Sequence, residues 1–591
     1  GGRWLVVGAA RAEVDVLAQL LEAQRGVECV RAYLDHDSGL TLPLDDASAL
    51  KAAFADLPGL NGAIYLAADA AAEAAAEADI EASLAAASRL MHLTQAMLSL
   101  PAPPPQLALL TRQAVVVTNA SAAPRVDQAA LWGLVKGIRL EHPELACQCI
   151  DLDGDISTLL SPHLAWIGRR DTPDLALHRR QVWTPSLQRR ALAARATPTV
   201  RADASYLISG GLGALGLHVA HWLVAQGARA LLLLGRRAPN DDAVARIAAW
   251  REQGVTVHTL AVDVADAQAL THALGEHQGT IAGVFHLAGV LDDGMILQQT
   301  REHLRVVLAP KLGGALNLQH ALADSSLDFF VAFSSVAALT GSMGQSTYAA
   351  ANAALDALMA GRRSMGQAGL SLQWGPWAEA GMAAAQAERD RQRFADYGIE
   401  PIGAEMAMSL LGRVMADNAP SSTLAILPVN WARYLGQLYG KDFPPIYRDL
   451  MAERPAAAAP VVSGLAERLL AEAPASRRAL LEQHLRDAVA AVLGLADRQK
   501  IAPRQRLFDL GLDSLGAVEL RNRLATALGR NLRATLLFDY PTLHALADHI
   551  EQDVLGIPAV VEPVAAAPEP ENLDHLSDDD LASLLAAELS S

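Results

Sequence analysis

The stretch YLISGGLGALG, residues 206–216, decides how this chain is interpreted. An apolar run of strand character leads into glycines spaced G-x-G-x-x-G, at Gly211, Gly213 and Gly216, and a helix is expected from about Leu217. Such glycines let the backbone approach a pyrophosphate, and the helix N-terminus offers unpaired N–H groups and partial positive charge. The pattern therefore predicts a dinucleotide site. The alternative is a tight glycine turn without a ligand.

The strands that follow add residues to this site. Strand 230–234 ends in Arg236 and Arg237, where an enzyme for NAD usually carries an acidic residue for the ribose 2′-hydroxyl. Arginine pairs instead with a 2′-phosphate, which favours NADPH, although two solvated arginines at a strand end are the alternative. The predicted cofactor-binding residues are Gly210, Gly211, Leu212, Gly213, Gly216, Gly235, Arg236, Arg237, Asp263, Val264, Ala288 and Gly289.

An approximate repeat links the first 200 residues to the next 250. WLVVGAA (4–10) resembles YLISGGLG (206–213), and GAIYLAAD (62–69) resembles GVFHLAGV (283–290). Short apolar runs alternate with Ala/Leu-rich amphipathic segments, which predicts α/β units with parallel sheets covered on both faces. We expect two tandem Rossmann-like units, of which the first, with Gly8-Ala9-Ala10, has lost cofactor binding. The expected strands are 4–7, 63–66, 107–110 and 147–152, then 206–209, 230–234, 256–261, 283–287, 329–333 and 370–374.

Composition narrows the classes of partner. The chain has 591 residues and a net charge of −17, which argues against nucleic acid or an anionic membrane surface as the main partner. No run of 18 apolar residues lacks a charge, so no membrane span is predicted. Cys29, Cys147 and Cys149 form neither a metal-ligand pattern nor a disulfide framework, and no signal peptide is recognised, so we expect a cytoplasmic protein. His218 and His221 are interpreted as packing or surface residues, so no metal is predicted.

Four residues between positions 311 and 352 fit the chemistry of ketone reduction. Hydride transfer to a carbonyl carbon leaves negative charge on the oxygen. Tyr348, at the start of a helix, would donate the proton as general acid, and Ser335, at a strand end, would hydrogen-bond the oxyanion. Lys311 would make proton release by Tyr348 easier and hold the nicotinamide ribose. Asn352, on the same helix face as Tyr348, would orient Lys311 or a proton-relay water. Taken singly, each also has an ordinary packing or surface interpretation.

The central region resembles the ketoreductase domain of modular polyketide synthases, a relative of the short-chain dehydrogenases/reductases. The matching segments are SGGLGALG (209–216), GRR (235–237), HLAGVLDDGMI (286–296), APKLGGALNL (309–318), FSSVAALTG (333–341), YAAANAALDALM (348–359) and LQWGPWAEAGMA (372–383). Most short-chain dehydrogenases place the lysine four residues after the tyrosine. Here Asn352 stands there and Lys311 lies upstream, an exchange that the polyketide family shares. Gly235 departs from the family, which often has Ser, so a hydroxyl contact to the 2′-phosphate is expected to be missing.

The first 200 residues resemble the family's structural subdomain, with LWGLVKGIRLEHPEL (131–145) as the best match. The resemblance also implies a stereochemical class. Leu291-Asp292-Asp293 resembles the B-type fingerprint, and Thr340 stands where A-types carry tryptophan. Ala350 replaces the proline of epimerising members, which implies a B1-type enzyme that forms a D-configured β-hydroxyl. The expected stereocontrol residues are Leu291, Asp292, Asp293, Trp374 and Met382, on a loop and a lid. The alternative is that both aspartates only cap the next helix.

The segment GLDSLGAVELRNRL (511–524) resembles the attachment site of an acyl carrier protein. The resemblance implies that Ser514 takes 4′-phosphopantetheine from a phosphopantetheinyl transferase, at the start of the second helix of a small all-α four-helix domain. Asp513 and Glu519 would give the acidic surface that such carriers present. The first carrier helix is expected to start near Ser476. The last residues, LSDDDLASLLAAELSS, are either an unstructured acidic tail or a helix resembling the docking motif that finds a downstream synthase subunit.

The expected order is therefore structural subdomain 1–200, catalytic subdomain 201–452, linker 453–474, acyl carrier 475–552, and flexible linker with docking-like helix 553–591. The resemblance implies NADPH-dependent reduction of a β-ketoacyl thioester on Ser514, with the other domains of the synthase as partners. The chain opens on a strand without an initiator methionine, which suggests that it comes from a longer polypeptide. Two alternatives remain: a carrier and docking scaffold with a redox-silent reductase fold, and the reductase–carrier part of a fatty acid synthase.

Overall fold

The structure is a computed structural model. It describes residues 2–34, 39–67, 80–101, 103–118, 123–169, 174–192, 198–378, 394–395, 397–417, 421–439, 443–452, 465–493, 501–510, 512, 514–530, 532 and 536–557. Four of the expected features lie outside these residues: Met382, Asp513, the segment 453–464 of the linker and the C-terminal docking-like helix. No described helix is both long enough and apolar enough to pass through a membrane.

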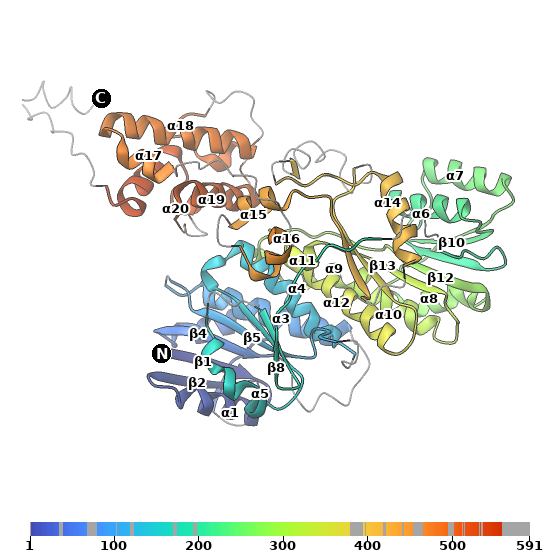
Figure 1. Ribbon diagram of the computed structural model, residues 1–591, viewed down its shortest axis with the longest axis horizontal. Helices are drawn as coiled ribbons and strands as arrows, with labels where there is room; N and C mark the ends of the chain where they lie inside the picture. The colour runs from blue at the N-terminus through green and yellow to red at the C-terminus, as the bar shows by residue number, and fades with distance from the viewer. Residues whose placement is uncertain are drawn as a thin grey trace, which may run out of the picture.

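The first unit is an eight-stranded sheet in the order β3-β2-β1-β4-β5-β6-β7-β8, with only the β7–β8 pair antiparallel. Its helices lie in the blue and cyan part of Figure 1. The strands are β1 Gly2–Gly8, β2 Val27–Tyr33, β3 Leu40–Thr41, β4 Leu60–Leu66, β5 Gln106–Arg112, β6 Gln148–Leu152, β7 Asp174–His178 and β8 Gln181–Trp183. The helices are α1 Arg11–Glu22, α2 Ala47–Ala55, α3 Ile80–Leu98, α4 Val126–Glu141 and α5 Ile156–Leu160.

The second unit is a seven-stranded parallel sheet in the order β11-β10-β9-β12-β13-β14-β15. From β9 the chain adds β10 and β11 on one side of the sheet and then β12 to β15 on the other side. Rossmann-type sheets bind ligands at this switch point, between β9 and β12. The strands are β9 Ser205–Ser209, β10 Ala230–Gly235, β11 Thr256–Ala261, β12 Ile281–His286, β13 Phe329–Ser335, β14 Leu370–Trp374 and β15 Thr423–Ile426. The helices are α6 Ala214–Ala225, α7 Asp241–Glu252, α8 Ala267–Leu274, α9 Arg301–Leu308, α10 Gly314–Ala321, α11 Ala337–Thr340, α12 Ser346–Ser364, α14 Ala404–Met415, α15 Trp431–Tyr439 and α16 Arg448–Ala452.

The two tandem Rossmann-type units are thus confirmed, and every strand expected from the sequence is present. The strands that the sequence did not reveal are mostly the outer ones. In β2 the sequence VECVRAY carries Glu28 and Arg31 within the apolar run, so it has neither a continuous apolar core nor clean alternation. The strands β3, β8 and β15 have two, three and four residues, too few to carry a pattern.

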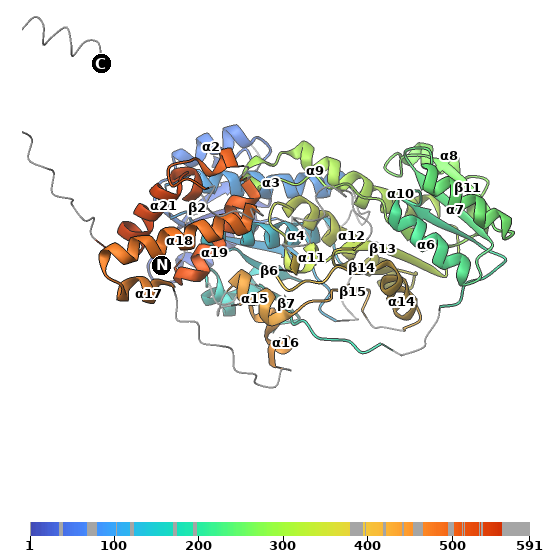
Figure 2. The same cartoon turned by 90° about the horizontal axis from the view of Figure 1, so that it is seen from above.

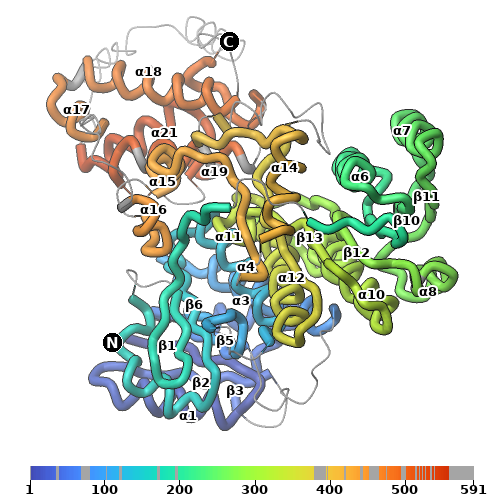
Figure 3. Tube along the Cα trace, turned by 45° about the vertical axis from the view of Figure 1, so that its right-hand side comes forward, coloured from blue at the N-terminus to red at the C-terminus, as the bar shows by residue number. Residues whose placement is uncertain are grey.

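The two units are joined by the packing of α4 against α12, which lie together at the centre of the molecule (Figures 2 and 3). Glycines on α4 make this close approach possible. A Cβ at Gly133 would lie 2.4 Å from the carbonyl oxygen of Ala349, and one at Gly137 would lie 2.2 Å from the Ser346 hydroxyl. One apolar cluster contains Leu134 of α4 together with Leu355 of α12, so the core is continuous from one unit to the other.

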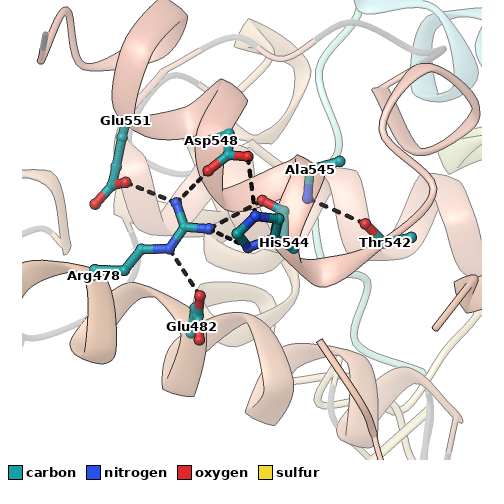
Figure 4. Close-up of polar contacts among 7 residues, drawn as sticks. All are labelled: Arg478, Glu482, Thr542, His544, Ala545, Asp548 and Glu551. Carbon is teal, nitrogen blue, oxygen red and sulfur yellow. Dashed lines mark hydrogen bonds and ion pairs between the residues drawn. The ribbon is translucent and has the colours of Figure 1, made fainter. Parts of the chain in front are cut away.

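The C-terminal part is an all-helical domain with its own apolar core. It contains α17 Leu465–Ala471, α18 Pro474–Leu493, α19 Ser514–Leu528, α20 Leu536–Asp539 and α21 Leu543–His549. The start of α18 is bound to α21 through Arg478, which donates to Asp548, Glu551 and the His544 carbonyl (Figure 4). The helix expected to start near Ser476 begins two residues earlier, at Pro474, so Ser476 lies within α18. A helix, α17, also lies within the segment expected to be linker and buries Leu469 in the domain core.

Candidate functional site

The glycine turn after β9 can only be built from glycine. Gly210 has a φ of +71°, a conformation that L side chains rarely adopt. A Cβ at Gly211 would lie 2.7 Å from the Ile208 carbonyl oxygen, and one at Gly216 would lie 2.4 Å from the Gly210 carbonyl oxygen. The helix α6 follows with Gly213 at its N-cap and no side-chain cap on its first N–H groups. This backbone surface, free of side chains, fits a pyrophosphate.

The neighbouring strand ends complete the cradle. Arg236 and Arg237 are exposed directly after β10, where a phosphate on the ribose could reach them. Gly235 is close to Leu212, since a Cβ there would meet the Leu212 side chain at 3.0 Å. The residues after β11 and β12 are also in the expected places. The Asp263 carboxylate accepts the Ala265 N–H at 3.0 Å. Val264 is buried, and its carbonyl oxygen accepts the Asn317 amide at 3.0 Å. Ala288 and Gly289 follow the end of β12.

Lys311 and Tyr348 are brought together beside this cradle. The Lys311 side chain is buried, and its ammonium lies 5.3 Å from the centre of the Tyr348 ring. The ammonium donates to the carbonyl oxygen of Phe333 at 2.9 Å, which ties it to β13. A Cβ at Gly289 would lie 3.0 Å from Lys311 Cε, so the lysine passes directly along the end of β12. Lys311 sits in a turn of π-helix, Ala309–Gly313, a feature often found at functional sites.

Asn352 and Ser335 complete the predicted set. Asn352 is fully buried one turn after Tyr348, and its amide donates to the Tyr348 carbonyl at 2.8 Å. Its Oδ1 is buried without a hydrogen-bond partner among the described residues, which leaves an acceptor for a cation or a water. Ser335 is the last residue of β13, two residues beyond the carbonyl that holds Lys311. Its hydroxyl is partly exposed and accepts the Ala337 N–H at 3.2 Å, rather than bonding to Tyr348.

A buried histidine that the sequence did not reveal supports the lysine turn. His286 ends β12; its Nε2 lies 2.7 Å from the Lys311 carbonyl oxygen and its Nδ1 lies 2.7 Å from the Ser209 hydroxyl. A carbonyl can only accept, so Nε2 carries the proton and Nδ1 accepts from Ser209. Burial lowers the pKa of His286 to about 4, and the cation of Lys311 acts in the same direction. The neutral ring therefore links β9, β12 and the π-helical turn. HLAGV was recognised only as a motif, and no spacing rule assigns this role to its histidine.

The loop with the LDD sequence is bound to the loop that precedes Tyr348. The Gln345 amide donates to both Asp293 oxygens at 3.2 and 3.0 Å, and the Gly294 N–H donates to the Gly344 carbonyl at 2.8 Å. The capping alternative for the two aspartates is wrong. The helix α9 is capped by Thr300, whose side chain accepts the His303 N–H. Through Gln345, Asp293 is therefore bound to the residue directly before α12.

Glu141, the last residue of α4, connects the first unit to both of these loops. Its carboxylate accepts the Ile296 N–H at 2.6 Å, the Gly344 N–H at 3.2 Å and the Ser346 hydroxyl at 2.8 Å. The residue is fully buried, and burial raises its pKa while these hydrogen bonds oppose the rise. Sequence reasoning quoted the motif LEHPEL but attached no function to this residue, because its partners lie more than 150 positions away.

The remaining predicted stereocontrol residues differ in exposure. Leu291 is 37% exposed, so it is accessible to a substrate, and Met382 lies outside the described residues. Trp374 is buried at the end of β14 and packs against Phe333 and Trp377. An effect of Trp374 on a substrate would therefore pass through these neighbouring rings, and its role stays a prediction.

Ser514 is the first residue of α19, as expected for an attachment site at a helix start. The matching family model is the phosphopantetheine attachment site, over residues 483–550. The KR domain model matches residues 204–379. The Rossmann fold domain of the polyketide synthase extender module SpnB matches residues 4–187. Together these models account for both Rossmann-type units and the helical domain. Ketoreductase domains use NADPH, and the phosphopantetheine domain carries that prosthetic group.

Similar whole proteins point the same way. The chain is 36% identical to polyketide synthase GfsB of Streptomyces halstedii over 496 residues, which are 78% of this chain and 9% of that protein. It thus spans only a small part of the curated relatives it matches. Among solved structures, A-type ketoreductases from a modular polyketide synthase are 31% identical, with a TM-score of 0.65, 76% of this chain and 95% of that chain covered. An A1-type ketoreductase is 32% identical, with a TM-score of 0.62 and coverage of 78% and 94%. The chain therefore belongs to the ketoreductases of modular polyketide synthases and carries a phosphopantetheine attachment domain behind its ketoreductase.

Proposed function

We propose that this chain reduces a β-ketoacyl group, held as a thioester on the phosphopantetheine arm of Ser514, to the β-hydroxyacyl thioester with NADPH. The observation that carries the proposal is the Lys311 ammonium, buried 5.3 Å from the Tyr348 ring beside a turn that only glycine can form. A buried cation needs compensation. The carbonyl of Phe333 and the Tyr348 ring supply it, so the lysine has a fixed position from which to act.

Each residue has one step in this reaction. NADPH, when bound, supplies the hydride that forms the new C–H bond. The Tyr348 hydroxyl gives its proton to the carbonyl oxygen, so the ketone becomes a neutral alcohol and the phenolate is left. Lys311 stabilises that phenolate through its charge, and the free Oδ1 of Asn352 accepts a hydrogen bond from the lysine or from a water that returns the proton. The Ser335 hydroxyl donates to the oxygen while it is negative.

Selection of NADPH over NADH is assigned to Arg236, with support from Arg237. Both side chains are exposed at the end of β10, where enzymes that use NAD usually carry an acidic residue for the ribose. Gly235 brings no hydroxyl, so the arginines carry the recognition of the 2′-phosphate. Gly210, Leu212, Gly213, Gly216, Asp263, Val264, Ala288 and Gly289 form the rest of the binding surface.

The stereochemical proposal is a B1-type reductase with a D-configured product. Leu291-Asp292-Asp293, Thr340 and Ala350 support it, since the loop that carries the aspartates is bound to Gln345, three residues before Tyr348. The solved relatives named above are A-type enzymes, and that property belongs to them. Chiral chromatography of the reduced thioester, against both synthetic alcohols, decides between the two outcomes.

The proposed function also implies further protein partners. We assign the loading of Ser514 to a phosphopantetheinyl transferase and the C-terminal helix to contact with a downstream subunit. The proposed domains are 1–200, 201–452, 475–552 and the C-terminal 553–591, with α17 as an additional helix before the carrier. The cysteines Cys29, Cys147 and Cys149 are free and buried, which is consistent with a reducing cytoplasm.

The decisive experiment compares the parent with Tyr348→Phe and Ser514→Ala. NADPH absorbance is followed with a free β-ketoacyl thioester, and the mass of the carrier is measured after incubation with coenzyme A and a transferase. Loss of the phenolic proton should slow reduction by about 10²–10⁴-fold, while Ser514→Ala should leave reduction of the free thioester intact and abolish loading. A parent that loads its carrier yet never oxidises NADPH would be a redox-silent scaffold instead.

A further inference from the structure

The carrier helix α19 touches the ketoreductase through one buried arginine. Arg521 Nη2 donates to the carbonyl oxygen of Glu141 at 2.7 Å, and Arg521 is only 3% exposed. The helix also packs against α15, and Figures 1 and 2 show the carrier beside α15, away from the cofactor-side helices α6, α7 and α8. The domains therefore meet at the end of α4 and at α15.

The end of α4 is a favourable place for a guanidinium. The last carbonyl groups of a helix have no partner within the helix and carry partial negative charge. Glu141 is the last residue of α4, and its carbonyl is one of these groups. Glu144, in the short turn that follows, also interacts electrostatically with Arg521. Arg521 thus acts as a cap that a different domain supplies.

The contact between Arg521 and the end of α4 is specific, but its net stabilisation is small. Arg521 Nε is buried and has no hydrogen-bond partner within the described part of the chain. A buried donor left unpaired offsets part of the gain from the hydrogen bond that is made. Such a balance suits a carrier that must leave this domain to visit others.

The contact also lies next to the catalytic loops. The residue whose carbonyl receives Arg521 uses its carboxylate to hold Ile296 and Ser346, and Ser346 lies two positions before Tyr348. Along α19, Arg521 follows Ser514 by seven residues, almost two turns, so both positions lie on one side of the helix about 10 Å apart. An arm attached at residue 514 therefore starts about two helical turns from the contact with Glu141.

We propose that Arg521 is the docking anchor by which this chain's own carrier presents its acyl group to the ketoreductase, with the C-terminal end of α4 and Glu144 as its receptor. This rests on the proposed function, since it gives the route by which the thioester on Ser514 reaches Tyr348. Docking through the arginine is needed only for substrate on the arm. A free thioester reaches the site without it.

The test uses the full chain with two substrates. In one, the arm of Ser514 is loaded with a β-ketoacyl group and a single turnover is followed by NADPH absorbance. In the other, a free β-ketoacyl N-acetylcysteamine thioester is reduced in steady state. Arg521→Ala should slow reduction of the arm-borne group about tenfold and leave the free thioester within about twofold. Arg530→Ala, a change at an exposed arginine just beyond α19, should affect neither.

Charge reversal provides the second variant. Arg521→Glu should slow the arm-borne reaction further, and adding Glu144→Arg should restore part of the rate. Intact mass shows whether each variant is loaded with the arm to the same extent as the parent, which confirms that its carrier folds. If the Arg521→Ala carrier is not loaded, Arg521→Lys replaces it in the comparison. If Arg521→Ala leaves the rate of the arm-borne reaction unchanged, Arg521 is not the docking anchor. An equal loss of rate with both substrates also overturns the anchor, because Arg521 would then support the fold of the reductase. A parent inactive on both substrates overturns the proposed function together with the anchor.

Discussion

The two Rossmann-type units share the same order of central strands, but they differ in the residues at the ends of two equivalent strand pairs. In the second unit, β9 ends in the glycine cradle and β13 ends at Ser335. In the first unit, β1 occupies the place of β9 and β5 that of β13. There Glu13, in the first turn of α1, pairs with Arg112, the last residue of β5, and both side chains are largely buried.

This difference concerns the electrostatics of the first helix of each unit. A helix N-terminus favours an anion, which is a pyrophosphate in a working Rossmann unit. In the first unit the carboxylate of Glu13 stands at that helix end, and Arg112 neutralises it. The protein thereby satisfies the electrostatic preference of this helix end with its own side chains.

The strongest test of this contrast is Glu13→Gln. The pair is largely buried, with side-chain exposures of 17% and 8%, so breaking it should lower the free energy of unfolding by about 3 kcal/mol. NADPH affinity should not change, because the proposed cofactor site lies in the other unit. Chemical denaturation and a fluorescence titration with NADPH measure the two effects. Glu81→Gln, which breaks only exposed ion pairs, is the control and should cost less than about 1 kcal/mol.

The buried histidine of the second unit should make that unit sensitive to acid. The pKa of His286 is about 4, whereas an unfolded histidine titrates near 6.5. The unfolded state therefore binds the proton first, and stability falls as the pH drops from about 6.5 to about 4, by about 3 kcal/mol in total. His286→Gln should be less stable at pH 7 but should lose this part of the pH dependence. Unfolding midpoints of both proteins, measured across this pH range, give the difference. Parallel curves for the two proteins would contradict the assignment.

The contact between the units can be tested by adding one methyl group. Gly137→Ala would place a Cβ 2.2 Å from the Ser346 hydroxyl, so α4 and α12 must move apart, at a cost of about 1–3 kcal/mol. Activity should fall with stability, because Tyr348 lies in the first turn of α12. Gly436→Ala, in α15 with no atom within 4 Å of the added Cβ, is the matched control and should be neutral or slightly stabilising. Equal stability of the two variants would mean that the helices do not approach this closely.

The smallest expected effect is that of Glu141→Gln. The amide has one acceptor oxygen in place of two, so if that oxygen keeps Gly344 and Ser346, the NH₂ group faces the Ile296 N–H and the hydrogen bond that holds Ile296, just after the LDD loop, is lost. Loss of one hydrogen bond of about 1 kcal/mol should change the ratio of the two alcohol products about fivefold. Chiral chromatography gives the ratio, and kcat with a free thioester gives the rate. A changed kcat with an unchanged ratio of the two alcohols would mean that Glu141 acts on Tyr348 and not on the LDD loop.

Much of this arrangement could be predicted from the sequence, because the patterns involved are local. The glycine turn, the central strands and the helix start at Ser514 each depend on residues within a few positions of one another. What escaped prediction depends on distant partners. His286 acquires its role from Ser209 and Lys311, and Glu141 from loops more than 150 positions later. The edge strands escaped for a different reason, since strands of two to four residues carry no period.

The glycine-lined crossing of α4 and α12 also limits how this enzyme can be recombined. A crossover between residues 187 and 204, at the seam between the two matched domains, would join α4 from one parent to α12 from another. The backbone at Gly133 leaves no space for a methyl group, so α4 and α12 from different parents would pack together only if both keep this close approach. Chimaeric synthases built from this chain should therefore transfer residues 2–452 as one exchange unit.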